Sequence, residues 1–145
     1  MDIQTDRLIL IVTGAHLRAE VSDRPIAYGL RQRLSAWLAA RGRSETVKTP
    51  RVVVCSDVWY LNNDPLRSRP TISIGGPGVN ALSAFLADKL PSAFAIEEVM
   101  LVQADPEFQE PVACCWGRDE EATAGAVEAF AERYLEGFME AAIRS

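Results

Sequence analysis

The chain contains few residues of the kinds that build metal centres and covalent active sites. Of its 145 residues one is histidine and three are cysteine, and no two cysteines have the spacing of zinc and redox motifs. Cys55, Cys114 and Cys115 all lie within apolar runs, which is typical of buried free thiols in a reducing compartment. We therefore expect no metal site, no cofactor and a cytoplasmic location.

Long apolar runs and an export signal are missing as well. No apolar run reaches the length that spans a bilayer, and acidic residues occupy the N-terminal stretch where a signal peptide is basic. The net charge of −5 disfavours nonspecific binding to nucleic acid or to anionic lipid. We therefore expect neither a nucleic-acid partner nor a membrane partner.

We predict a single domain that spans residues 1–145. Apolar residues make up 48% of the chain, which suffices for one hydrophobic core. Aliphatic or alternating runs predict strands, and apolar residues at helical spacing predict helices. Strands are expected at 8–12, 51–55, 71–74, 98–102 and 112–116, and the second of them could extend through 57–60. Helices are expected at about 22–41, 79–90 and 119–143.

This order, β-α-β-β-α-β-β-α, predicts an α/β fold. We expect a three-layer sandwich in which three helices flank a mixed, mostly parallel sheet of about five strands. The link between the last two strands is short enough for a hairpin, which makes the sheet mixed. The direction of the third strand relative to the first two is left open by the sequence.

The stretch 70–91 joins a strand, a glycine turn and a helix without a gap. A helix that opens from a glycine turn offers free backbone N–H groups and the positive end of a dipole, which suits a phosphate or carboxylate. We therefore predict that Gly75, Gly76, Gly78 and Asn80 bind a ligand. The alternative is structural: the glycines only allow a tight turn, and Asn80 caps the helix.

A second candidate loop lies between the last strand and the last helix. There the indole of Trp116 could stack on a ligand and Arg118 could pair with an anion. The alternative is that Trp116 closes one end of the core.

His16 and Asp57 are weak catalytic candidates. If the third strand is parallel to the first two, these residues share one edge of the sheet with the glycine loop. His16 could then act as a general base that Asp57 orients. The alternative is that His16 is a surface or capping residue and that Asp57 caps a turn.

Charge is distributed unevenly along the chain. Residues 1–50 hold 8 Lys or Arg against 5 Asp or Glu, whereas residues 97–145 hold 3 against 12. Four of these acids recur every fourth residue of the last predicted helix, where like charges repel. They form either a solvated face or a surface that meets arginines of a partner, for instance the basic first helix of another copy: Glu128, Glu132, Glu136 and Glu140.

Two functions remain open at this point. The sequence favours a non-catalytic interaction or assembly protein, either a homo-oligomer or one subunit of a larger complex. The alternative is a domain that binds a small anionic or nucleotide-like ligand at the Gly75–Gly78 loop, with or without enzymatic activity. Few acids, bases and nucleophiles converge in the predicted fold, which is the reason for favouring assembly.

Overall fold

A computed structural model describes residues 7–41 and 50–145. Its centre is a six-stranded sheet with the order β2-β1-β3-β6-β5-β4. The strands are β1 Leu8–Thr13, β2 Arg51–Ser56, β3 Thr71–Ile74, β4 Ser92–Ile96, β5 Met100–Ala104 and β6 Val112–Gly117. The helices are α1 Leu17–Ala40, α2 Asp57–Leu61, α3 Ala81–Leu86, α4 Glu120–Arg133, α5 Leu135–Arg144 and the short 3₁₀ helix η1 Asp64–Ser68.

The sheet is mixed and mostly parallel, as predicted. β1 lies parallel to β2 and β3, and β3 lies parallel to β6. β5 runs antiparallel to its neighbours β6 and β4. The sheet has one strand more than expected, because β4 was missed. β4 is an edge strand without a buried side chain, so its sequence lacks the apolar pattern that identified the others.

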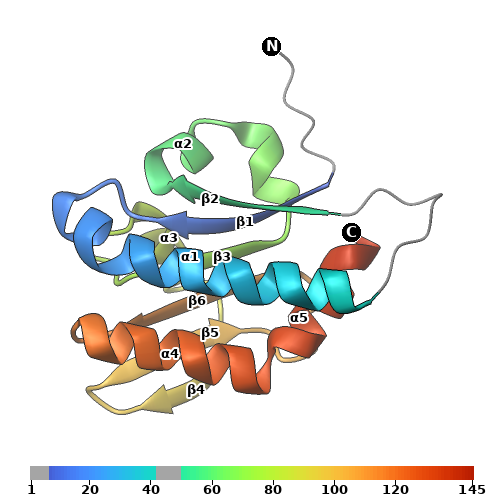
Figure 1. Ribbon diagram of the computed structural model, residues 1–145. Coiled ribbons are helices and arrows are strands. Elements are labelled where there is room, and N and C mark those ends of the chain that lie inside the picture. The colour runs from blue at the N-terminus through green and yellow to red at the C-terminus, as the bar shows by residue number, and fades with distance from the viewer. Residues whose placement is uncertain (1–6, 42–49) are drawn as a thin grey trace.

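Two hydrophobic clusters lie on the two sides of the sheet. Alternate residues of β1 enter them: Ile9 and Ile11 pack with α1, α4 and α5, whereas Leu10 and Val12 pack with residues of α2, η1 and α3. In Figure 1, α1 and α4 lie side by side in front of the strands. β1 is buried along its whole length and pairs with a strand on either side, β2 and β3.

The first helix begins earlier than the sequence suggested. α1 starts at Leu17, with His16 as its N-cap, so Pro25 lies inside the helix rather than in its first turn. The run from Ser22 to Pro25 resembles a helix start because it joins a capping residue to a residue without an N–H. Because α1 begins at Leu17, Asp23 lies within the helix, on its buried side.

Three other elements differ from the prediction. Residues 57–61 form α2 rather than an extension of β2, because the Ser56 side chain accepts a hydrogen bond from Trp59 N and caps a helix there. The helix expected at 79–90 is the shorter α3. The long C-terminal helix is divided at Tyr134, whose backbone leaves the helical region at φ −127°. Together with α2, this division gives five α-helices in the described part of the chain instead of the three predicted.

No helix in the described ranges is both long enough and apolar enough to cross a membrane.

Candidate functional site

Four parallel strands end at the same edge of the sheet. Because β1, β2, β3 and β6 share one direction, the loops that follow them lie together. The parallel direction of β3 therefore puts the glycine loop on the edge that also holds His16 and Asp57. Gly75 N donates a 3.0 Å hydrogen bond to Cys115 O, which joins the glycine loop to the end of β6.

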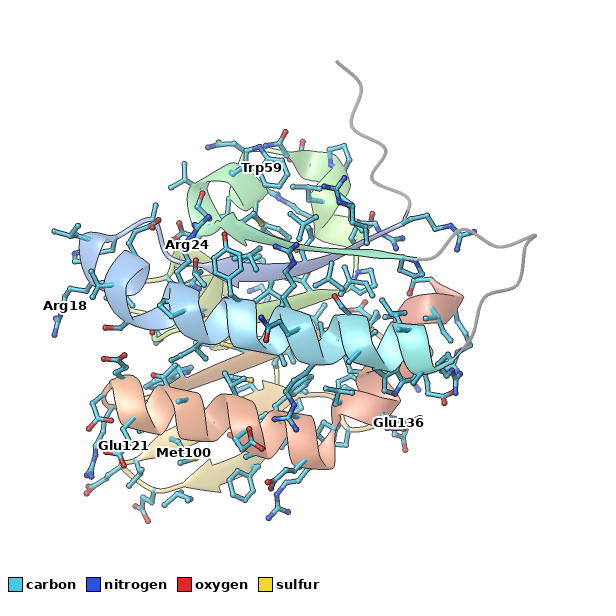
Figure 2. All side chains as sticks on the ribbon, viewed as in Figure 1. Arg18, Arg24, Trp59, Met100, Glu121 and Glu136 are labelled. Carbon is cyan, nitrogen blue, oxygen red and sulfur yellow. The ribbon has the colours of Figure 1, made fainter. Side chains whose placement is uncertain are left out.

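A pocket of about 310 Å³ opens at this edge. Its walls come from the first turns of α1, from the glycine loop and from the junction of β6 with α4. Both loops predicted from the sequence line it, through Gly76, Gly78, Trp116 and Arg118. Figure 1 shows that α1 and α4 begin at the same end of the molecule, and Figure 2 shows Arg18 and Glu121 at that end.

The glycine loop can approach α1 only because Gly75 has no side chain. Gly75 has φ +108°, and a Cβ there would lie 2.5 Å from Asp23 Oδ2. A Cβ added at Gly76 would lie 3.4 Å from Cε3 of the Trp116 ring, so the backbone of Gly76 lies beside the indole. A Cβ on Gly78 would meet no atom within 4 Å. The loop thus presents bare backbone to the pocket between a carboxyl group and an indole ring.

Asp23 is the pocket residue that sequence reasoning missed. Its side chain lines the pocket, the residue is only 6% exposed, and no hydrogen bond or ion pair joins it to another residue in the described part of the chain. Burial raises the pKa of Asp23 to about 6, and the negative charge of Glu120 adds to the increase. A signal was present: Asp23 interrupts the buried stripe of α1, which otherwise consists of Ala19, Ala27, Leu30 and Leu34.

Positively charged side chains stand at the mouth of the pocket. Arg18 is exposed, and the side chain of Arg118 is 65% exposed. Arg118 approaches Asp119 only through Nε, at 3.9 Å from Oδ2. The pocket is therefore lined by one buried acidic residue, Asp23, and by two arginines with exposed side chains.

Asp57 holds three segments of the edge together. Its Oδ1 accepts hydrogen bonds from Ala15 N at 2.9 Å and Val58 N at 2.7 Å, and its Oδ2 accepts one from Ala81 N at 2.7 Å. The residue is buried. Both carboxylate oxygens thus serve backbone groups of the β1–α1 loop, α2 and α3.

Asn80 has a similar role at the start of α3. Its Oδ1 accepts from Leu82 N and Ser83 N, while its Nδ2 donates to Val12 O and Ile74 O. It is almost completely buried. Its hydrogen-bonding groups are directed at the backbone, so it shapes the loop that lines the pocket.

His16 caps α1. Its Nδ1 accepts a 3.2 Å hydrogen bond from Arg18 N, and within the described residues no bond joins it to Asp57. A catalytic pair of His16 and Asp57 stays a prediction, and the contacts seen here are those of helix and loop capping.

The three cysteines are buried and free. Burial raises the pKa of Cys55 to about 12 and that of Cys114 to about 11. Such thiols hold their protons at neutral pH, so they are poor nucleophiles. In the described ranges, no group of three His, Cys, Asp or Glu side chains is placed to hold a metal ion.

The acidic stripe of the C-terminal helices meets α1 of the same chain. Arg33 Nη1 lies 2.6 Å from Glu128 Oε2, and Arg41 Nη1 lies 3.1 Å from Glu140 Oε1. Trp37 Nε1 donates a 2.6 Å hydrogen bond to Glu136 Oε2. The acidic stripe could have met arginines of a partner, but in this structure arginines of the same molecule contact it.

Comparison with known protein families, with curated proteins and with solved structures found no match to this chain.

Proposed function

We propose that this protein is a binding domain for a small polar molecule with an acidic group. The ligand enters the pocket between α1, the glycine loop and the β6–α4 junction. The observation that carries the proposal is the position of Asp23, a buried carboxyl group that lines this pocket and has no partner among the described residues.

The place and the size of the pocket support this function. Ligands of α/β proteins bind where parallel strands end, and the volume of about 310 Å³ falls at the lower end of the range for small-molecule sites. Arg18 and Arg118 provide positive charge at the mouth for the acidic group of the ligand.

The composition of the walls supports it as well. A buried charge without a partner costs stability, and such groups cluster at functional sites. At the same position an alanine would extend the apolar stripe of α1 without that cost. A ligand that bonds to the carboxyl group would offset this cost.

Self-association remains the alternative, but it has lost its most specific support. The acidic stripe no longer needs a second molecule, because Arg33, Trp37 and Arg41 of the same chain contact three of its four glutamates. Ligand binding, by contrast, has additional support, because both predicted loops and the carboxyl group of Asp23 line one pocket. The balance of observations therefore favours ligand binding over assembly.

The proposal can be tested by a nuclear magnetic resonance titration of ¹⁵N-labelled protein with phosphate, acetate, succinate and adenosine monophosphate. We expect at least one of them to shift the amide signals of Gly76, Gly78 and Gly117. Gly78→Val should abolish the shifts, since a Cβ there meets no atom within 4 Å and the added methyl groups would take up space at the pocket. Gly29→Val, also in open space but on α1 outside the pocket, is the matched control. Shifts that Gly78→Val leaves intact would overturn the proposal.

A further inference from the structure

The inner wall of the pocket is acidic. Asp23 faces the glycine loop, and the charge of Glu120 acts on it from α4. Asp119 also lines the pocket and uses Oδ1 to accept a hydrogen bond from Ala122 N. A ligand that reaches this wall therefore meets acceptors and negative charge.

No side chain of the described residues neutralises Asp23. The nearest cation in sequence, Arg24, is engaged with other residues, since its Nη1 lies 3.6 Å from Glu20 Oε1 and its Nη2 donates to Tyr28 Oη. Buried carboxylates in proteins are normally paired with a cation or accept hydrogen bonds. The missing partner of Asp23 is thus a group that donates hydrogen bonds or carries positive charge.

The outer end of the pocket has the opposite character. Arg18 forms no side-chain bond with another described residue, and Arg118 is held only by the 3.9 Å contact to Asp119. Their guanidinium groups have donors available for a carboxylate or phosphate. The Trp116 ring, packed on Gly76, supplies apolar surface in the same pocket.

These opposite ends define one class of ligand. We infer that the pocket binds a zwitterionic molecule, whose protonated amino group lies against Asp23 and whose acidic group faces Arg18 and Arg118. This inference rests on the proposed function, because it concerns the same pocket. It adds the amino group and the orientation of the ligand.

Matched compounds of three lengths test the inference. They are the ω-amino acids β-alanine, 4-aminobutyrate and 6-aminohexanoate, each compared with the carboxylic acid that lacks its amino group and with the amine that lacks its carboxyl group. Dissociation constants come from the shifts of the Gly76 and Gly78 amides. We expect an ω-amino acid of one length to bind at least about tenfold more tightly than both of its matched compounds.

Two variants assign the orientation. Asp23→Asn should abolish the advantage of the amino acid over the carboxylic acid, and Arg118→Gln should abolish its advantage over the amine. Glu121→Gln, an exposed position on α4 outside the pocket lining, is the matched control and should leave both advantages unchanged.

The outcomes separate this inference from the function it rests on. If carboxylic acids bind at Gly76 and Gly78 as tightly as the amino acids do, or if Asp23→Asn keeps the preference, the inference is wrong while ligand binding at the pocket stands. If no compound of either panel shifts these amides, the proposed function is wrong together with the inference.

Discussion

Asp23 occupies a buried position of α1 where a purely structural helix would have an apolar residue. It lies on the same face as Ala19, Ala27, Leu30 and Leu34, and its carboxyl group is buried against the glycine loop. Its pKa is raised from 3.8 to about 6 by burial and, to a lesser extent, by Glu120. The folded state therefore binds this proton more tightly than the unfolded state does.

The raised pKa predicts how Asp23→Asn changes stability with pH. Between about pH 4 and pH 6 the folded protein holds the Asp23 proton while the unfolded chain releases it, so rising pH lowers the free energy of unfolding through this window. Two pKa units correspond to about 3 kcal/mol. We expect Asp23→Asn to be more stable than the wild type by up to this amount at pH 7.5, with no difference at pH 3.5.

Urea unfolding at several pH values measures this difference. The charge of Glu120 acts on Asp23, and Asp119, Arg18 and Arg118 line the same pocket; all four are unchanged in the variant. Glu121→Gln on the exposed side of α4 serves as the control and should show no comparable dependence on pH. Equal stabilities of Asp23→Asn and wild type at pH 7.5 would contradict the buried position of the carboxyl group.

Substitution of Asp57 should destabilise the protein, in contrast to Asp23→Asn, because both carboxylate oxygens of Asp57 accept hydrogen bonds. Asp57→Ala would leave the N–H groups of Ala15, Val58 and Ala81 without their acceptor. We expect a loss of about 3 kcal/mol in the free energy of unfolding, since hydrogen bonds to charged groups contribute 1.5–3 kcal/mol each and water will replace part of them. Thermal unfolding compared with Asp64→Ala, an exposed site, measures it. A loss as small as that of Asp64→Ala would show that these bonds contribute little.

Contacts between α1 and the C-terminal helices explain the uneven charge of the chain. Arg33 of α1 pairs with Glu128 of α4, and Arg41 at the C-cap of α1 pairs with Glu140 of α5. The pairs are about half exposed, with 45% and 55% for Arg33 and Glu128. Exposed pairs of this kind contribute less than about 1 kcal/mol each. Their main effect is to fix how the helices lie against each other.

Charge reversal tests whether these pairs form within one molecule. Arg33→Glu should destabilise the protein by up to about 1 kcal/mol, and the double variant Arg33→Glu with Glu128→Arg should recover the loss. Mixing the two single variants should recover nothing. Recovery on mixing would place the pairs between two molecules, as a homo-oligomer requires.

The sequence predicted elements well where their pattern was complete and local. β1 is a continuous aliphatic run, so it was recognised as a strand, and the glycine loop could be placed between β3 and α3 from its residues alone. β4 could not be found, because an edge strand with no buried side chain lacks the alternation of apolar and polar residues that identifies a strand. α2 was hidden as well, since the apolar residues after Asp57 suit a strand and a short helix equally.

The candidate site was predicted in part. Gly76, Gly78, Trp116 and Arg118 were chosen for the chemistry of their loops, and the structure places all four around one pocket. Asp23 was missed because the proline two residues later suggested the first turn of a helix rather than its interior. A buried carboxyl group in the middle of a helix is recognisable only when the start of that helix is known.

At the scale of the whole molecule, the direction of β3 decides whether there is a site. Residues 57–68 form α2 and η1 and return the chain to the start of β3, which makes β3 parallel to β1. Had these residues formed a hairpin, the glycine loop would lie at the opposite edge from His16 and α1. This choice depends on packing between distant segments, so local sequence patterns could not determine it.

The ligand site that we propose lies at this edge of the sheet. The most direct test is a crystal structure of the protein with the tightest binder from the two compound panels. We predict electron density for the compound between Asp23 and Arg118, beside the glycine loop. Density in the separate apolar cavity of about 290 Å³ lined by Tyr60, Phe85 and Lys89, with none at Asp23, would contradict the account.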